Sequence, residues 1–348
     1  MPAAIVPAVG LESRSREAPP RPERNPRIHI LDPLRGLASL AVAWFHLAHE
    51  NPAVSRGSLL QQSGSYGWIG VEAFFVISGF VIPFALASSG YTLHDYGRFL
   101  LKRVVRLDPP YFVAITVSLL IAIYGWFAMG QGVFPFTFRQ ILLHFGYLNV
   151  FFHYEWLNPV FWTLAVEVEY YVLIGLCFPL LRKVRFVWLV MAPIGLVLAF
   201  VPQFEFHVFR YLPFFFLGIA AYHVKMDRLP TPAFVLMTLT IAVVASAVFG
   251  WPATIAALLT SWAIVFLKGA PRPLVLLGSI SYSLYLLHGP IGFTVSSILV
   301  RRVPGLPQVV TSLTALAASM VGAWALFRLV ERPSQRLSGR IRYTQRLS

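Results

Sequence analysis

Ten stretches of this chain are long and apolar enough to cross a lipid bilayer. Hydrophobic residues make up 57% of the chain, charged residues only 12%, and the mean hydropathy is +0.69. A soluble globular protein is about a quarter charged, so this composition indicates a protein built for lipid. We therefore expect an all-α, polytopic membrane bundle of about 10 transmembrane helices. The predicted spans are residues 32–49, 67–88, 109–130, 160–181, 186–202, 208–224, 231–249, 252–268, 279–300 and 308–330.

Basic residues are distributed unevenly between the two sides of the predicted bundle. The net charge is +14, and 23 of the 28 lysines and arginines fall in segments that the alternating spans place on one side. This is the positive-inside rule, and it predicts that both termini are cytoplasmic. The basic surplus is thereby attributed to membrane topology, and no nucleic-acid partner is expected.

Three regions are expected along the chain. Residues 1–28 are rich in Arg, Pro, Glu and Ser and predict a disordered, basic cytoplasmic tail. Residues 29–337 form the transmembrane domain, and residues 338–348 form a second short cytoplasmic tail. Within the domain, residues 139–156 are aromatic but make a poor span, which indicates a re-entrant or interfacial piece. Cys177 is the only cysteine, and we interpret it as a packing residue.

The first predicted span contains an arginine and a histidine eleven residues apart. Arg35 lies near its start and His46 toward its far end. Eleven residues advance a helix by about 16 Å and almost a whole number of turns, so both side chains point the same way. Ionisable groups inside a membrane are costly and are candidates for function. Alternatively, Arg35 anchors the helix end and His46 hydrogen-bonds a neighbouring helix.

A carboxylate in the second predicted span is a candidate partner for this histidine. Glu72 lies in an otherwise apolar run, near the same outer end as His46. A buried carboxylate needs a partner, and a carboxylate commonly orients an imidazole that acts as a general base. The two residues are therefore expected to form a dyad. In the alternative interpretation, Glu72 is an interfacial carboxylate that ends the helix in water.

Two arginines lie just before the third span, in a loop expected to be cytoplasmic. Arg103 and Arg106 are three residues apart and share a helical face. Such a pair suits phosphate groups, because guanidinium offers planar, bidentate donors. The alternative is a juxtamembrane anchor for anionic lipid headgroups.

The fourth span begins with two acids and several aromatic residues. Glu167 and Glu169 lie on different faces, because a two-residue step turns a helix by about 200°. At least one of them is therefore expected to face a polar cavity. Trp162 and Tyr170 give the same segment a hydrogen-bonding surface that is compatible with sugars, so Trp162, Glu167 and Tyr170 are candidate substrate-binding residues.

Three further sequence features have less specific interpretations. His288 shares a helical face with Tyr285 and either contributes to the cavity or makes a polar contact between helices. Glu331 is interpreted as part of a cytoplasmic helix terminus, and Ser78 as a helix-packing residue. Metal-ligand spacings such as HExxH are absent, as are the P-loop and GxGxxG, so no metal is expected.

Taken together, these segments resemble the membrane-bound acyltransferase family 3, bacterial enzymes that O-acylate sugars and some secondary metabolites. The resemblance covers residues 29–337 and implies the stand-alone form, without a soluble esterase-like domain. The motifs that carry it occur in order as LRGLA followed by His46, VEAFFVISGF, the arginine pair, FWTLAVEVEYY, SYSLYLLH and VERP.

The resemblance implies roles for several of these residues. His46 is expected to be the catalytic base and Glu72 to assist it, although the family more often has Asp at this position. Arg103 and Arg106, together with Arg35, are expected to bind acyl-CoA as the donor.

The function implied is that of an O-acyltransferase of the bacterial inner (plasma) membrane, most simply an O-acetyltransferase. Its partners are expected to be acyl-CoA, a cell-surface or lipid-linked glycan as acceptor, and membrane lipids. Two alternatives remain open: acylation of a macrolide-like natural product, or a proton-coupled transporter that uses the His/Glu pair. Transporters often show internal repeats, and this chain shows none.

Overall fold

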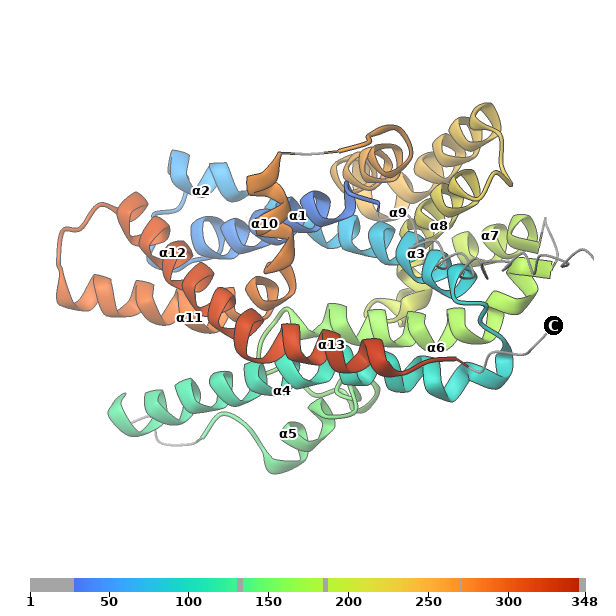
Figure 1. The fold of residues 1–348 in the computed structure, drawn as a ribbon. Coiled ribbons are helices and arrows are strands. Elements are labelled where there is room, and N and C mark those ends of the chain that lie inside the picture. The colour runs from blue at the N-terminus through green and yellow to red at the C-terminus, as the bar shows by residue number, and fades with distance from the viewer. Residues whose placement is uncertain (1–27, 130–133, 184–186, 270, 344–348) are drawn as a thin grey trace, which may run out of the picture.

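The computed structural model describes residues 28–129, 134–183, 187–269 and 271–343. Helices are the regular secondary structure throughout these residues, as the sequence predicts (Figure 1). The expected tail 1–28 lies outside the described residues except for Ile28, as do residues 344–348 of the second tail.

The first half of the chain contains six α-helices. The π-helical turn η1 (Phe45–His49) directly extends α1, so the first predicted span is a single continuous helical segment. The predicted interfacial piece consists of the short helix α5 and the 3-10 turn η4 (Val150–Phe152). The bounds are α1 Leu31–Trp44, α2 Leu59–Gly64, α3 Gly70–Ser88, α4 Tyr96–Met129, α5 Phe138–His144 and α6 Phe161–Lys183.

The second half contains seven more helices. A second π-helical turn, η6 (Phe327–Glu331), joins the last two, and α13 lies along α4 (Figure 1). The bounds are α7 Val187–Leu198, α8 Val208–Lys225, α9 Thr231–Phe266, α10 Arg272–Ser279, α11 Ser281–Arg302, α12 Gln308–Leu326 and α13 Arg332–Arg340.

Within the described residues, six helical segments are long and apolar enough to cross a membrane. Helices α1 and α7 are shorter, with 14 and 12 residues. Helix α9 is broken at Gly250, where a φ of 76° lies outside the helical region, and this break falls between the predicted spans 231–249 and 252–268. The six segments are Leu59–Ser88, Leu93–Phe127, Phe161–Arg182, Thr231–Phe266, Ser281–Arg302 and Gln308–Arg340.

Helix α3 occupies a central position because two glycines let it approach α8 closely. A Cβ at Gly79 would overlap the backbone of Phe215, and a Cβ at Gly218 would overlap the carbonyl of Val76. Close backbone approach through small residues is the usual way in which membrane helices pack. Ser78, the neighbour of Gly79, is turned about 100° around α3 from this contact and lines a cavity.

Candidate active site

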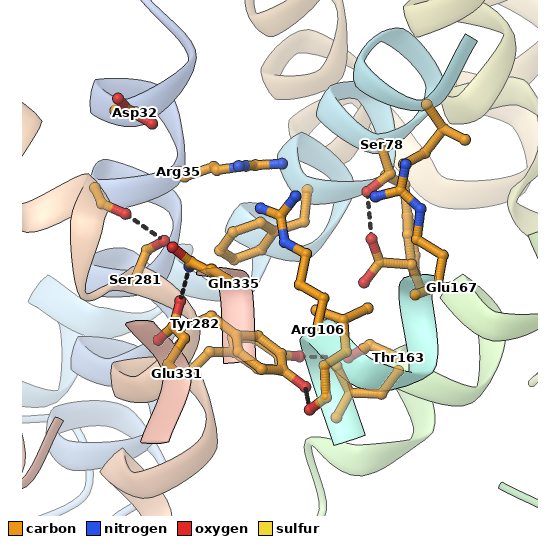
Figure 2. A pocket seen from close by; sticks show the side chains of 18 of the residues that line it. Asp32, Arg35, Ser78, Arg106, Thr163, Glu167, Ser281, Tyr282, Glu331 and Gln335 are labelled. Carbon is orange, nitrogen blue, oxygen red and sulfur yellow. Dashed lines mark hydrogen bonds between the residues drawn. The ribbon is translucent and has the colours of Figure 1, made fainter. Parts of the chain in front are cut away.

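A cavity of about 390 Å³ lies between α1, α3, α4, α6, the end of α10, α11 and the η6–α13 junction. Its wall combines charged groups with apolar and aromatic side chains, the composition that is usual for a small-molecule site. Figure 2 shows the polar groups that converge on it. The charged and hydroxyl-bearing residues that line it are Asp32, Arg35, Ser78, Arg103, Arg106, Thr163, Glu167, Tyr171, Ser279, Ser281, Tyr282, Tyr285 and Glu331.

The three arginines singled out in the sequence meet in this cavity. Arg35 comes from α1, whereas Arg103 and Arg106 come from α4. The guanidinium groups of Arg35 and Arg106 extend toward each other (Figure 2). The positive charges of Arg35 and Arg106 repel each other. An anion bound between the two guanidinium groups would offset this repulsion.

Arg103 is the most deeply buried of the three, with an exposed fraction of 9%. Its guanidinium carbon lies 5.3 Å from the ring centre of Phe99 and 5.4 Å from that of Tyr171. These cation–π contacts orient the side chain. Its Nε has no hydrogen-bond partner, so one donor is left for a ligand.

The two glutamates that line the cavity accept hydrogen bonds from neutral donors. Ser78 Oγ donates to Glu167 Oε1 at 2.6 Å. Ser283 Oγ donates to Glu331 Oε2 at 2.6 Å, and Gln335 Nε2 donates to Oε1 at 2.9 Å. Among the described residues, neither carboxylate forms an ion pair with a cavity arginine, so the guanidinium groups keep their donors for a bound ligand.

Glu331, interpreted from the sequence as part of a cytoplasmic helix terminus, is a buried residue of the cavity wall. It ends the π-helical turn η6 and is only 4% exposed. A π-helical turn shifts the following side chains around the helix axis, and such turns are frequent at functional sites. The local sequence VERP does not predict this π-helical turn. Sequence reasoning also missed the cavity position of Ser78, which it treated as packing.

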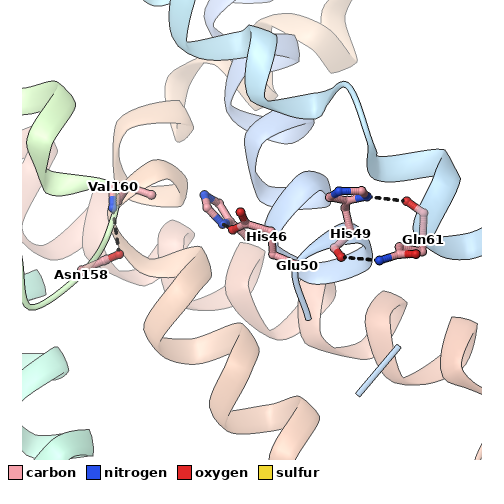
Figure 3. A network of polar contacts seen from close by, with 6 residues as sticks. All are labelled: His46, His49, Glu50, Gln61, Asn158 and Val160. Atoms are coloured by element: carbon pink, nitrogen blue, oxygen red, sulfur yellow. Dashed lines mark hydrogen bonds and ion pairs between the residues drawn. The ribbon is translucent and has the colours of Figure 1, made fainter. Parts of the chain in front are cut away.

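His46 lies in the other π-helical turn, η1, away from the arginines. Its Nδ1 lies 2.7 Å from Oε2 of Glu50, one turn further along the chain. Figure 3 shows these two side chains on one face of the turn, whereas His49 points to Gln61 on another. The His46 side chain is 14% exposed and Glu50 is 48% exposed. The hydrogen bond from His46 lowers the pKa of the Glu50 carboxyl, which keeps Glu50 ionised.

The predicted contact between His46 and Glu72 is not made in the structure. Glu72 lies in the first turn of α3, is 5% exposed, and its Oε2 has no hydrogen-bond partner. The carboxylate that orients His46 is Glu50, because residues four apart on one helical turn are neighbours.

A row of side chains on α11 connects His46 to the arginine cavity. The ring centre of His46 lies 5.1 Å from that of His288, which lies 5.9 Å from that of Tyr285. The Tyr285 hydroxyl lies 2.7 Å from Oγ1 of Thr163. Tyr285 and Thr163 both line the cavity, so the two halves of the site are separated by little more than the two rings of α11.

The remaining candidates of α6 have different positions. Trp162 lies outside the cavity wall and packs against Phe206, with ring centres 5.8 Å apart. Tyr170 stacks on Phe215 at 4.0 Å and borders a separate apolar pocket of about 160 Å³ between α6, α7 and α8, which Cys177 also borders. Only Glu167, among the three predicted substrate-binding residues, faces the arginines.

Glu169 has a structural role, as its position on another face of α6 indicates. Its Oε2 accepts the backbone N–H of Val208 at 2.9 Å, at the N-terminus of α8, and Oε1 lies 3.0 Å from His207 Nδ1. An acid at a helix N-terminus satisfies a backbone donor that has no partner within its own helix. The two acids of FWTLAVEVEYY therefore divide between the cavity and helix packing.

Comparison with known proteins supplies the family. A model of the acyltransferase 3 family, described as an acyltransferase domain, matches residues 28–328. The chain therefore belongs to the acyltransferase 3 family. It is also similar to a protein of the Acidianus two-tailed virus named as a candidate acetyltransferase, with 28% identity over 203 residues. This match covers 54% of this chain and 56% of the viral protein, so the chain spans about half the length of that relative. No solved structure matches the chain.

Membership of the acyltransferase 3 family and the six apolar helical segments identify a multi-pass membrane protein. The region matched by the family model contains Arg35, His46, the arginine pair of α4, and Glu167. Glu331 lies three residues beyond the end of this match. The cavity and the His46 turn are thus both built mainly from the matched region.

Proposed function

We propose that this chain is an O-acyltransferase of the inner (plasma) membrane, most simply an O-acetyltransferase. It moves an acyl group from acyl-CoA to a hydroxyl group of a cell-surface or lipid-linked glycan. The observation that carries this proposal is the convergence of Arg35, Arg103 and Arg106 on one cavity. The rings of Tyr285 and His288 lie between this cavity and His46. Family membership supports acyl transfer as the reaction class.

The arginine cavity is proposed as the donor site. Acyl-CoA carries phosphate groups, and guanidinium binds phosphate through paired, planar hydrogen bonds. With the phosphates at the arginines, the thioester arm extends toward Tyr285, on the cavity wall nearest His288. We place this cavity at the cytoplasmic side, where acyl-CoA is made and where the positive-inside rule puts the α4 arginines.

His46 is proposed as the general base. The Glu50 carboxylate accepts the Nδ1–H of His46, which leaves Nε2 free to take the proton of the acceptor hydroxyl. The hydroxyl oxygen then attacks the thioester carbonyl, the carbon–sulfur bond breaks, and the proton goes to the sulfur to give CoA thiol. General-base assistance of this kind contributes about 10²–10⁴ in rate.

The arrangement also suits an acceptor that approaches from the side opposite the donor. His46 lies about 16 Å along the helix from Arg35, and its partner Glu50 is half exposed. A surface glycan reaches this end of the bundle without passing the arginine cavity. The surrounding membrane lipids contact the apolar outer faces of the helices.

The experiment that tests the proposal is mass spectrometry of surface glycans from cells with and without the gene, and from cells that carry H46A or H49A. His49 is the matched control, because it lies in the same turn but hydrogen-bonds the Gln61 carbonyl. We expect wild type and H49A to add one acyl mass to the glycan, and H46A to lose at least about 10² in rate at normal membrane abundance.

An unchanged glycan profile on removal of the gene would contradict the glycan acceptor. Full activity of H46A would contradict the proposed role of His46. Incubating membranes with acetyl-CoA of labelled acetyl group, followed by recovery of the label from the glycan fraction, identifies the donor directly.

A further inference from the structure

His288 is a buried imidazole that has one bonded nitrogen and one nitrogen without a partner. It lies on α11 with an exposed fraction of 0%. Its Nδ1 lies 3.0 Å from the carbonyl oxygen of Leu284, and its Nε2 has no hydrogen-bond partner. Since the carbonyl only accepts, Nδ1 carries the proton and Nε2 presents a lone pair. Leaving a buried acceptor without a hydrogen-bond partner is unfavourable, so a partner that engages Nε2 during function would remove this cost.

Two titratable rings contact His288, and His46 is the closer of them, because the ring centre of Tyr285 lies 5.9 Å away. The ring centres of His46 and His288 are 5.1 Å apart and the rings are inclined by 32°. Nδ1 of His46 is held by Glu50, so its other nitrogen, Nε2, is the one that gains a proton when His46 acts as a base. Each ring therefore has its Nδ1 bonded and its Nε2 free.

The elements packed around η1 supply few other titratable groups. Helices α2 and α12 both contact this turn, and their sequences contain no acidic, basic, cysteine or tyrosine residue. Helix α1 contributes Asp32 and Arg35 only at its far end. His49 and Glu50 lie on η1 and just after it. Helix α11 carries Tyr282 and Tyr285 before His288, and Arg301 and Arg302 at its C-terminal end. The hydroxyl of Tyr285 is hydrogen-bonded to the hydroxyl of Thr163.

We propose that His288 is a positioning residue that stabilises protonated His46 during acyl transfer, through the lone pair of its own Nε2. This inference rests on the proposed function, in which His46 takes a proton. The acceptor O–H bond breaks as an N–H bond forms at Nε2 of His46. The imidazolium then has the Glu50 carboxylate on one side and the His288 lone pair on the other, until its proton passes to the sulfur of the leaving CoA.

Two amide replacements separate this role from simple packing. In H288Q, the longer side chain places its amide near the position of Nε2 and can keep an acceptor there. In H288N, the shorter side chain places its amide near Nδ1, where it can keep the hydrogen bond to Leu284 but offers no acceptor at Nε2. H288M, which fills a similar volume without a ring nitrogen, replaces H288N if that variant does not accumulate.

The readout is the reaction of His46 with diethyl pyrocarbonate, which attacks only unprotonated imidazole. It is measured against pH in detergent-solubilised full-length protein and assigned by fragment-ion mass spectrometry. The tryptic peptide that carries His46 also carries His49, so His49 is an internal control. E50Q is the positive control, because it removes the bonded carboxylate. H223Q is the control for the loss of a buried imidazole elsewhere in the bundle. His223 lies on α8 and is 1% exposed.

In H288N, we expect the pH at which modification of His46 is half-maximal to be lower than in wild type by about 0.5 unit or more. H288Q is expected to stay close to wild type, and H223Q and the His49 reaction to be unchanged. In the acyl transfer assay, H288N is expected to lower kcat about 10-fold or more with little change in the donor KM, and H288Q to recover most of the rate.

An H288N profile identical to wild type, while E50Q shifts, would overturn the inference. Equal loss of activity in H288N and H288Q would also overturn it, because packing alone would then explain the effect. The modification assay needs neither donor nor acceptor. Failure of the wild type to acylate any glycan would therefore overturn the proposed function separately, whatever the modification assay shows.

Discussion

The His46 side chain is defined chemically by its near neighbours along the chain. The π-helical turn places Glu50 2.7 Å from Nδ1, whereas Glu72, the partner implied by the family resemblance, is buried in α3 without a bond to the ring. A carboxylate at this position fixes the tautomer of the histidine and stabilises its protonated form. Rates of single-residue variants therefore distinguish the two carboxylates.

E50Q is expected to lower the acyl transfer rate more than E72Q does. Glutamine at residue 50 removes the charge that stabilises protonated His46, whereas Glu72 does not contact the ring. The low pKa of Glu50 means that this contact is fully present above the usual carboxylate range and is lost only as the pH falls through the lowered value. Wild-type activity should therefore show no loss from Glu50 protonation near neutral pH.

The measurement is the acyl transfer rate of wild type, E50Q and E72Q between pH 5 and pH 9. In E50Q, the acidic limb of the rate profile is expected to move to lower pH. A larger loss in E72Q than in E50Q would instead support a functional dyad of His46 and Glu72.

Individual helices carry the site through the spacing of their residues. On α4, a three-residue step puts Arg103 and Arg106 on one face, and the structure directs that face into the cavity. On α3, adjacent residues divide their tasks, since Gly79 packs against α8 while Ser78 binds Glu167. Each of these arrangements has its own test.

The double variant R103K/R106K is expected to raise the KM for acyl-CoA about 10-fold, while membrane insertion stays normal. Lysine keeps the charge but loses the bidentate geometry that favours phosphate. R98K is the matched control, because Arg98 is on the same helix outside the cavity wall and interacts with Asp95. An unchanged KM and maximal rate in the double variant would assign these arginines to lipid anchoring alone.

G79A is expected to lower the stability of the protein by about 1–3 kcal/mol, the usual result of overpacking. The added methyl group meets the backbone of Phe215, which cannot rotate away. G125A is the control, because a Cβ at Gly125 has no neighbour within 4 Å and alanine is the better helix former. The measurement is thermal unfolding in detergent, and equal stability of the two variants would contradict the close contact of α3 with α8.

The molecule as a whole places the arginine cavity and the His46 turn at different depths of one bundle. This separation suits a donor from one side of the membrane and an acceptor from the other. It requires the α4 arginines to face the cytoplasm, because acyl-CoA is made there. The distribution of basic residues supports the same orientation.

Reporter fusions test this orientation. Fusions at Ser348 and within residues 89–108 are expected to give cytoplasmic signals, and a fusion near Gln131 an external one, because the long helix α4 separates these positions. An external signal from a fusion within residues 89–108 would contradict this orientation. It would place Arg103 and Arg106 on the side of the membrane away from cytoplasmic acyl-CoA.

Properties that depend on local spacing could be predicted from the sequence. Apolar runs and basic flanks indicated helices in a membrane, because burying a backbone in lipid requires internal hydrogen bonds. Helical periodicity separated Glu167 from Glu169 and paired Arg103 with Arg106, because these relations depend only on the turn per residue.

Relations that depend on contacts between helices, or on irregular turns, required the tertiary structure. The π-helical turns at His46 and Glu331 have no signature in the residues that form them, although they decide which side chains meet. Trp162 and Tyr170 sit on α6 beside Glu167, yet packing against α8 and the residues before it turns them toward aromatic neighbours. The approach of His288 to His46 joins residues 242 positions apart. Such an approach is set by how the helix faces pack together, which periodicity within one helix does not encode.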